Sequence, residues 1–227
     1  MSQSQNQIIH ADCFDVFPKI SDKSINLSIT DIPYNYVNKT HSSRPKPLRN
    51  LDKGIADSAE IDITKLITEL VRITKGSIYI FCEYAQVSDI ISLFRSNGLT
   101  VRMMIWEKTN PSPMNGSKLW LSGVEMCIFA RFPNATFNGH CRNTVLKYPT
   151  KRSKLHPTEK PQELLIDLIQ TSSNRGDLIL DCCAGSGSLA VACHSVNRNF
   201  IVIEKNKEFF EIMKSRITKH TVQEILH

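Results

Sequence analysis

The sequence predicts an α/β fold with a doubly wound, mostly parallel sheet, and three observations support this prediction. Short runs rich in β-branched residues alternate along the chain with segments whose apolar residues recur at helical spacing. No internal repeat, low-complexity tract or long linker interrupts the alternation. Residues 181–188 join the end of one run to a glycine-containing turn and the start of a helical segment. Such alternation is typical of parallel sheets that bind ligands at the carboxyl ends of their strands.

The first 132 residues are expected to contain most of the strands. Short segments rich in apolar and β-branched residues predict strands at 8–10, 25–30, 77–82, 100–107 and 125–132, and 77–82 is a continuous β-branched and aromatic run. Apolar residues at helical spacing predict one or two helical turns at 14–20 and helices at about 60–74 and 85–95. We expect Gly76 to end the first of these helices, and Asn97 with Gly98 to end the second. The last two strands are expected to be neighbours in the sheet.

The C-terminal third has the most regular alternation. Its pattern predicts a helix from Pro161 to about Thr171, a strand at 178–181, a helix at 188–196, a strand at 200–204 and a last helix from about Lys207. Proline suits the first position of a helix because its fixed φ is already helical. At a length of 227 residues, the chain is expected to form a single domain over 1–227.

Composition argues against a membrane protein and favours the cytoplasm. No stretch approaches the ~18 uncharged apolar residues of a membrane span, and residues 1–7 lack the apolar core of a signal peptide. The cysteines are an odd set without a C-x-x-C pair, which predicts buried free thiols in a reducing compartment and no metal site. These cysteines are Cys13, Cys82, Cys127, Cys141, Cys182, Cys183 and Cys193.

Basic residues concentrate in two segments without apolar periodicity, at about 36–57 and 133–155, which are expected to be loops. The whole chain carries a net charge of +6. Lysine and arginine that neutralise phosphates give sequence-independent affinity, so both loops are candidates for contact with a polyanion. Solvated basic loops without a partner are the alternative. The candidate contacts are Lys39, Arg44, Lys46, Arg49, Arg142, Lys151 and Arg152.

Residues 31–35, Asp-Ile-Pro-Tyr-Asn, follow directly after an expected buried strand. The carboxylate of Asp31 and the backbone carbonyl of Ile32 can each accept a hydrogen bond from an exocyclic amino group. Pro33 fixes the backbone, and Tyr34 offers a ring on which a heterocycle can stack. This combination predicts chemistry on a nucleobase. A plain strand-to-turn junction is the alternative.

Residues 181–188, Asp-Cys-Cys-Ala-Gly-Ser-Gly-Ser, predict the binding of an adenosine-containing cofactor. Gly185 and Gly187 allow the backbone to come close to a ligand, and the start of the next helix offers free N–H groups. Glu204 ends the next expected strand, where its carboxylate can accept both hydroxyls of a ribose. The alternatives are a tight turn without a ligand and a site for a nicotinamide dinucleotide, which uses the same kind of turn.

Read together, these motifs resemble those of the amino-group DNA methyltransferases, which act on N6 of adenine or N4 of cytosine. Asp31-Ile-Pro-Tyr34 resembles their catalytic motif D-P-P-Y, and residues 181–188 resemble their cofactor motif D-P-F-x-G-S-G-T. His156-Pro-Thr-Glu-Lys-Pro161 resembles the segment that precedes the cofactor motif in one permuted group. The catalytic motif comes first and the cofactor motif last, which is the circularly permuted order of the β class.

The resemblance implies a Rossmann-like methyltransferase fold with S-adenosyl-L-methionine as the cofactor. Asp12 is implied at the adenine, Glu204 at the ribose, Asp181 and the glycine turn at the methionine end, and Thr158 with Lys160 at the carboxylate. The implied catalytic residues are Asp31, Ile32, Pro33 and Tyr34, and the implied cofactor-binding residues are Asp12, Asp31, His156, Thr158, Lys160, Asp181, Ala184, Gly185, Ser186, Gly187 and Glu204.

Two departures from the family pattern stand out. Ile32 replaces the usual proline, which leaves the clamp intact because a backbone carbonyl accepts the amino hydrogen. Cys182-Cys183 replaces Pro-Phe, which puts an aromatic contact to the cofactor in doubt.

The predicted function is therefore site-specific methylation of N6 of a flipped-out adenine in double-stranded DNA, with the two basic loops as DNA-contacting or target-recognition segments. Asp31 favours adenine, since the cytosine enzymes more often resemble S-P-P-Y. The alternatives are a cytosine-N4 methyltransferase, an RNA methyltransferase, a nicotinamide-dependent oxidoreductase and a silent nucleic-acid-binding homologue. The recognition sequence, a homodimer and a cognate restriction enzyme stay open.

Overall fold

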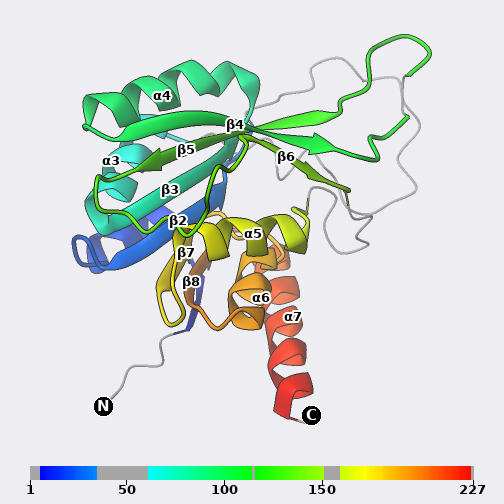
Figure 1. Ribbon diagram of the computed structural model, residues 1–227. Helices are drawn as coiled ribbons and strands as arrows, with labels where there is room; N and C mark the ends of the chain where they lie inside the picture. Colours follow the sequence, from blue (N-terminus) through cyan, green and yellow to red (C-terminus); the bar gives the residue numbers. More distant parts are fainter. Residues whose placement is uncertain (1–5, 35–60, 114–115, 151–158, 226–227) are drawn as a thin grey trace.

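The computed structural model describes residues 6–34, 61–113, 116–150 and 159–225, which form one eight-stranded sheet with helices on both faces (Figure 1). The strand order is β1-β8-β7-β2-β3-β5-β4-β6. The strands are β1 (Gln7–His10), β2 (Ile25–Asp31), β3 (Thr74–Cys82), β4 (Thr100–Lys108), β5 (Val124–Arg131), β6 (Val145–Tyr148), β7 (Leu178–Asp181) and β8 (Asn199–Glu204). Neighbours are parallel except that β5 runs antiparallel to β3 and β4. The prediction of a mostly parallel sheet is confirmed.

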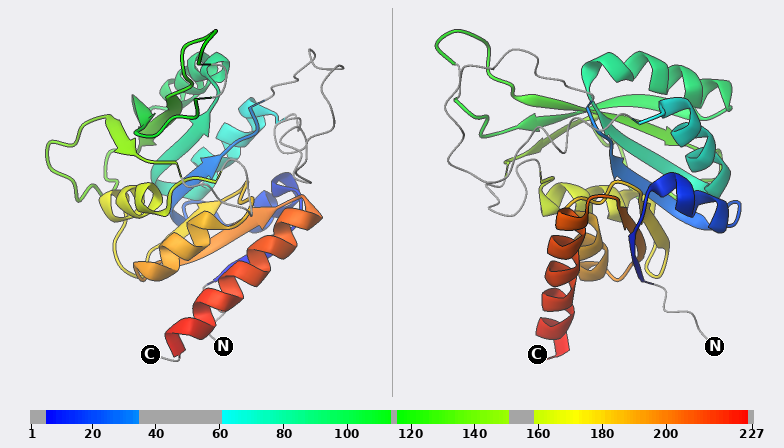
Figure 2. Two further views of the ribbon diagram at one scale, coloured as in Figure 1. Left: turned by 90° about the vertical axis from the view of Figure 1, so that its right-hand side faces the viewer. Right: turned by 180° about the vertical axis from the view of Figure 1, so that it is seen from behind.

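Helices complete three layers (Figure 2). One face carries α1 (Cys13–Val16), η1 (Phe17–Lys19), α3 (Ile63–Ile73) and α4 (Val87–Ser96), which follows the short η2 (Tyr84–Gln86). The other face carries α5 (Gln162–Ser172), α6 (Ser188–Ser195) and α7 (Lys207–Ile225). Each face has its own core of buried apolar side chains. Within the described ranges, none of these helices is long and apolar enough to cross a membrane.

The prediction that Gly76 ends a helix is wrong. α3 ends at Ile73, and Gly76 lies inside β3, where a Cβ atom would be 2.0 Å from the carbonyl oxygen of Asn26. β2 has a register shift between Ile25 and Leu27, next to this close approach. The glycine is required because two backbones come together there, and a local helical pattern carries no sign of that contact.

The segment at 133–155, expected to be a loop, contains the strand β6. It pairs in parallel with β4, from Val145 beside Ile105 to Tyr148 beside Lys108. Leu146 is buried in the core between β4 and α5. Four residues are too few for a strand pattern to stand out among basic neighbours, so the sequence did not reveal the strand.

All seven cysteines are free thiols, and five of them are buried as predicted. Cys183 is half-buried, and Cys141 is exposed, so the prediction of buried thiols is wrong for Cys141. This residue lies in the irregular segment before β6, where no apolar run surrounds it.

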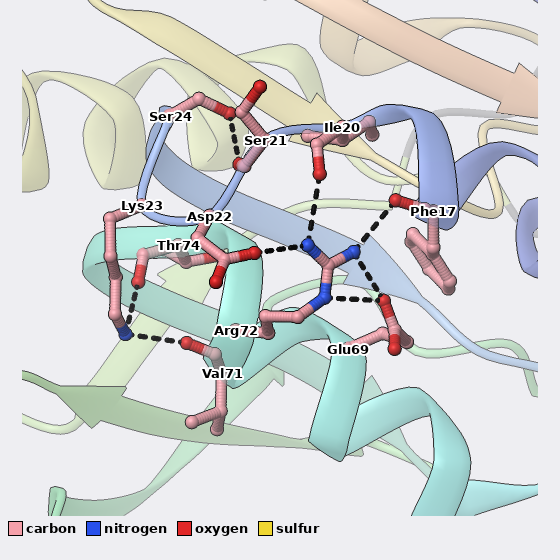
Figure 3. Close-up of polar contacts among 10 residues, drawn as sticks. All are labelled: Phe17, Ile20, Ser21, Asp22, Lys23, Ser24, Glu69, Val71, Arg72 and Thr74. Atoms are coloured by element: carbon pink, nitrogen blue, oxygen red, sulfur yellow. Dashed lines mark hydrogen bonds and ion pairs between the residues drawn. The ribbon is translucent and has the colours of Figure 1, made fainter.

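Polar contacts around Arg72 hold the end of α3 against the segment that leads into β2 (Figure 3). The Arg72 guanidinium donates to the carbonyls of Ile20 and Phe17 at 3.0 and 2.8 Å, and it pairs with Glu69 at 2.6 Å. Lys23 donates from the other side to a carbonyl in the last turn of α3 at 2.6 Å. These bonds give buried and half-buried carbonyls their partners and anchor the start of β2.

The chain leaves the sheet in opposite directions from β2 and β7, which are neighbours. From β2 it continues through α3 to β3, and from β7 it continues through α6 to β8 on the other side. A crevice forms where the connections of two adjacent parallel strands diverge. Asp31 ends β2 and Asp181 ends β7, so both carboxyl groups lie at this crevice.

Candidate active site

A cavity of about 480 Å³ lies at the carboxyl ends of β2, β7 and β8. Three aromatic residues, Phe14, Phe81 and Phe209, form part of its wall. The predicted site residues that line it are Asp12, Asp31, Ile32, Pro33, Tyr34, Lys160, Asp181, Ala184, Gly185, Ser186 and Glu204. The structure therefore brings two motifs that are about 150 residues apart in the chain to one cavity, because parallel strands end at the same edge.

The turn at 31–34 follows β2 and is held from three sides. Tyr34 donates a hydrogen bond from its hydroxyl to Oδ1 of Asp31 at 3.0 Å. The amide of Ile32 donates to a carbonyl of β3 at 3.2 Å, and Nε2 of Gln86 donates to the carbonyl of Pro33 at 3.1 Å. The Ile32 side chain is 2% exposed and packs in the core. Isoleucine at this position therefore keeps an amide hydrogen bond that proline cannot form.

Charged side chains alternate in sign beside this turn. Nζ of Lys160 lies 2.5 Å from Oδ2 of Asp31 and 3.0 Å from Oε2 of Glu125. The other oxygen of Glu125 lies 2.8 Å from Nζ of Lys108. Oε2 of Glu125, at 3.3 Å from the hydroxyl of Tyr34, is a second acceptor for the single hydrogen of that hydroxyl. The structure thus places Lys160, which was expected at the carboxylate of the cofactor, against the catalytic motif.

Burial and neighbouring charges set the ionisation of this cluster. Burial raises the pKa of Asp31, and Lys160 offsets part of the rise. Burial alone would lower the pKa of Lys160, but Asp31 and Glu125 outweigh it and hold that pKa well above its usual value. Burial would raise the pKa of Glu125, but Lys160 and Lys108 outweigh it and lower that pKa. At neutral pH, Lys160 is a cation and Glu125 is an anion.

In the glycine turn between β7 and α6, Gly187 packs against α7 and is not part of the cavity lining. Gly187 has a φ of 79°, and a Cβ atom there would lie 2.6 Å from Cγ of Met213. The amide of Gly185 donates to Oε2 of Glu204 at 2.7 Å, and the amide of Asn206 donates to Oε1 of Glu204 at 2.7 Å. Glu204 therefore ties the turn to the end of β8, and its carboxylate retains further lone pairs for a ligand.

The lining of the cavity is acidic. Five acidic side chains face it with two lysines, and the buried Asp181 is the most perturbed of the acids at the cofactor turn. Oδ1 of Asp181 accepts a hydrogen bond from the amide of Cys183 at 3.0 Å. Burial nonetheless raises the pKa of Asp181 to about 7. Such a lining favours a ligand that carries positive charge.

Asp12 has a structural role as well as a place at the cavity. Its Oδ1 caps α1 by accepting a hydrogen bond from the amide of Phe14 at 3.0 Å, and its Oδ2 lies 2.8 Å from Nζ of Lys205. The hydrogen bond from Lys205 lowers the pKa of Asp12, so its carboxylate is ionised when a ligand arrives. The capping role of Asp12 and the predicted cofactor contact are thus compatible.

Other predicted contacts are placed elsewhere or are not described. Arg142, a candidate for polyanion contact, is paired with Asp167 of α5 and does not line the cavity. The residues that lie outside the described ranges are Lys39, Arg44, Lys46, Arg49, Lys151, Arg152, His156 and Thr158. Their roles stay predictions.

Sequence reasoning missed several residues of the site, among them Glu125 and Phe209. Glu125 is the second residue of a mostly apolar strand, and the one carboxylate in such a run is the signal that could have drawn attention to it. Phe209 lies on α7, where nothing in the local pattern separates it from an ordinary core residue. With Phe14, it supplies aromatic surface in the cavity where Cys182-Cys183 supplies none.

Comparisons with known proteins agree with this geometry. A family model for DNA methylases of the N6 and N4 type matches residues 117–215. Type II methyltransferase M2.LlaDCHI of Lactococcus lactis subsp. cremoris is 26% identical over 240 residues, which cover 93% of this chain and 89% of that protein. Type II methyltransferase M.HpaI of Haemophilus parainfluenzae is 29% identical over 246 residues, which cover 93% of this chain and 74% of that protein.

Solved structures show the same relationship. The M1.HpyAVI–SAM complex superposes with a TM-score of 0.70 and 27% identity, and the match covers 93% of this chain and 98% of that chain. PvuII DNA methyltransferase, described as cytosine-N4-specific, shares the fold with a TM-score of 0.68 at 15% identity, over 93% and 89% of the two chains. Motif order, cavity and similarity therefore lead to one family. The resemblance of this chain to the amino-group DNA methyltransferases, with S-adenosylmethionine as the cofactor, is therefore confirmed.

Proposed function

We propose that this chain transfers a methyl group from S-adenosyl-L-methionine to the exocyclic N6 of an adenine within a specific sequence of double-stranded DNA. One observation carries the proposal, namely that the turn at 31–34 and the turn at 181–188 line the same cavity. A carboxylate suited to an amino group and a glycine turn suited to the cofactor thus face one space. Catalysis then rests on placing the amino nitrogen in line with the methyl group.

The turn at 31–34 would grip the target base. Asp31 and the carbonyl of Ile32 accept the two amino hydrogens, so the nitrogen moves toward tetrahedral geometry and its lone pair is freed from the ring. The base must leave the DNA stack to reach this turn, which costs a few kcal/mol. Stacking on Tyr34 offsets part of that cost, and the hydroxyl of Tyr34 is already fixed by its bonds to Asp31 and Glu125.

The charge of the cavity favours S-adenosylmethionine over a nicotinamide dinucleotide. The first carries a sulfonium and an ammonium group, whereas the second carries a negative pyrophosphate. Acidic side chains outnumber lysines in the lining, and the amide of Gly185, which a pyrophosphate would need, already donates to Glu204 at 2.7 Å. Calorimetric binding of NAD without binding of S-adenosylmethionine would refute this assignment.

For the cofactor, we assign Asp12 to the adenine edge, Glu204 to the ribose hydroxyls, and Asp181 with the turn at 184–187 to the methionine end. The amide of Ala11 donates to the carbonyl of Glu204 at 3.2 Å, which puts Asp12 and Glu204 at adjoining strand ends. That spacing suits a nucleoside whose base and sugar are gripped by neighbouring residues. His156 and Thr158 complete the proposed site from outside the described residues.

Identification of the labelled base tests the substrate. Tritium from labelled S-adenosylmethionine, followed by nucleoside analysis of the DNA, should yield N6-methyladenine. Cytosine N4 is the second candidate, because the same turn can hold any exocyclic amino group and the fold is shared with a cytosine-N4-specific enzyme. Label found in N4-methylcytosine alone would replace adenine by cytosine, and label found in RNA alone would remove DNA as the substrate.

Substitution of Asp31 tests the clamp. Asp31→Ala should lower methyl transfer by at least about a hundredfold, because an acceptor for the amino group is lost. Its affinity for S-adenosylmethionine should stay within a few fold of the wild type, since Asp31 is assigned to the base. Asp89→Ala is the matched control, because Asp89 is exposed on α4 and does not line the cavity. Retained activity in Asp31→Ala would contradict the role of the carboxylate.

A further inference from the structure

Glu125 contacts the methyl-transfer site without an assigned role in it. It is the second residue of β5, beside Trp106 of β4 in the ladder. Because β5 is antiparallel to β3, its start lies at the edge where β3 ends. Oε2 of Glu125 accepts a hydrogen bond from Tyr34 at 3.3 Å and lies 3.0 Å from Nζ of Lys160. One oxygen of this carboxylate therefore contacts two side chains that also bind Asp31.

Lys160 depends on Glu125 for charge balance. The Lys160 side chain is 7% exposed, and its Nζ lies 5.0 Å from the ring centre of Phe81 and 5.7 Å from that of Tyr34. A buried ammonium requires anionic partners, because removing one partner of a buried pair leaves an uncompensated charge. Glu125 supplies the second partner, at 3.0 Å beside the 2.5 Å contact with Asp31.

Sharing of Lys160 affects what Asp31 can offer to a base. A carboxylate has about four lone-pair positions, and those of Asp31 already serve Lys160 and Tyr34. If Glu125 were neutral, Lys160 would have Asp31 as its remaining anionic partner and would compete more strongly for the lone pairs that an amino group must use. The hydroxyl of Tyr34 would also lose one of its two acceptors.

We propose that Glu125 is a positioning residue for methyl transfer: it shares Lys160 with Asp31 and holds Tyr34, so that the Asp31 carboxylate stays oriented and available to the target amino group. The proposal rests on the proposed function. Glu125 needs no contact with the base or the cofactor, and Lys108, at 2.8 Å from its other oxygen, fixes it from the far side.

Lys160 and Glu125 act on the ionisation of Asp31 in opposite directions. Burial raises the pKa of Asp31; beyond that, the charge of Lys160 lowers it and the charge of Glu125 raises it. The groups that face Asp31 are Lys160, Glu125, Tyr34, Cys82, Cys127 and Asp181, with Lys108 behind Glu125. Burial raises the pKa of Cys82 to about 12 and that of Cys127 well above its usual value, so both thiols stay neutral.

Two measurements on four variants test the proposal. The variants are Glu125→Gln, Lys160→Met, the double variant with both changes, and Glu107→Gln as the matched control. Glu107 lies on the adjoining strand β4 and pairs with Lys147 at 3.3 Å away from the cavity. Methyl transfer to DNA gives kcat and KM over a range of pH. A titration of 13C-labelled aspartate by NMR, with Asp31→Asn for assignment, follows Asp31 in the ligand-free proteins.

Glu125→Gln should lower kcat about tenfold or more, while KM for S-adenosylmethionine changes within about twofold. The apparent pKa of Asp31 should fall by roughly half a unit or more in Glu125→Gln and rise in Lys160→Met. The acid limb of the rate profile should move in the same two directions. Lys160→Met leaves a buried charge without its partner and can therefore fail to fold. The double variant keeps the test usable in that case. The pKa of Asp31 in the double variant should be higher than in Glu125→Gln.

The proposal is overturned if Glu125→Gln matches Glu107→Gln in both measurements, or if kcat falls while the titration of Asp31 does not move. A merely structural role of Glu125 would not shift the titration in opposite directions for the two single variants. If the wild type transfers no methyl group to DNA, the proposed function fails. The NMR titration then still decides whether Glu125 sets the state of Asp31.

Discussion

Replacement of Asp181 by asparagine is expected to remove a strong pH dependence from the stability of the ligand-free protein. Asp181 is 7% exposed, and burial raises the pKa of its carboxyl from 3.8 to about 7. In the unfolded chain this carboxyl is ionised above about pH 4. Between these two pKa values the folded state binds more protons than the unfolded state, so the free energy of unfolding falls as the pH rises.

The size of the effect follows from the two pKa values. The full difference between them corresponds to roughly 4 kcal/mol of unfolding free energy, of which about 2.5 kcal/mol is lost between about pH 5 and about pH 8. Asparagine has nearly the same shape, and its oxygen can still accept the hydrogen bond from Cys183, whose amide nitrogen lies 3.0 Å from Oδ1 in the wild type. The substitution therefore removes the titration with little change in packing.

Urea unfolding of the wild type and Asp181→Asn, followed by circular dichroism at several pH values, measures this contribution. The variant should gain stability over the wild type by roughly 2–3 kcal/mol between about pH 5 and about pH 8. Other carboxyls and histidines titrate in both proteins and cancel in the difference, and Asp89→Asn provides an exposed control. Parallel stability curves for the two proteins would refute the argument that burial raises the pKa of Asp181.

Two further substitutions test the turns that frame the cavity. Gly187→Ala should lower the melting temperature and weaken binding of S-adenosylmethionine in calorimetry, because the added Cβ would lie 2.6 Å from Cγ of Met213. Gly98→Ala is the control, because Gly98 also has a positive φ but a Cβ there meets open space. Equal losses of melting temperature in the two variants would contradict the role of the contact with Met213. Gln86→Ala should lower kcat about tenfold with little change in cofactor affinity, because the 3.1 Å bond to the carbonyl of Pro33 is lost. Equal kcat for Gln86→Ala and for Gln170→Ala, at an exposed position on α5, would contradict a role of that bond.

Many of the helices and strands could be predicted from residue patterns, because they are long or are bounded by turn residues. β3 and β4 each contain a stretch of mostly apolar residues, at 77–82 and 103–106, and α3 buries Leu66, Ile67 and Leu70 on one side at helical spacing. The convergence of Asp31, Asp181 and Glu204 was also predictable, because each ends a parallel strand and such ends share one edge. The order of the strands in the sheet could not be predicted, because pairing partners are set by contacts between segments that are distant in the sequence.

Short elements and close contacts were beyond local patterns. β6 has four residues, and its pairing with β4 is visible only in three dimensions. Gly76 was misread because a glycine after a helical stretch usually ends the helix, whereas here it admits the carbonyl of Asn26. In both cases the deciding contact comes from a partner strand, about which the neighbouring residues carry no information.

The ion pairs beside Asp31 show a more specific gap in sequence reasoning. A search for functional residues at the ends of parallel strands finds Asp31, and it also finds Lys108, which ends β4. It passes over Glu125, because this residue stands at the start of a strand. β5 is antiparallel to both neighbours, so its start lies at the edge where they end, and the carboxylate reaches Lys108 at 2.8 Å and Lys160 at 3.0 Å. In a mixed sheet, polar residues that begin an antiparallel strand therefore belong in the same search as those that end a parallel one.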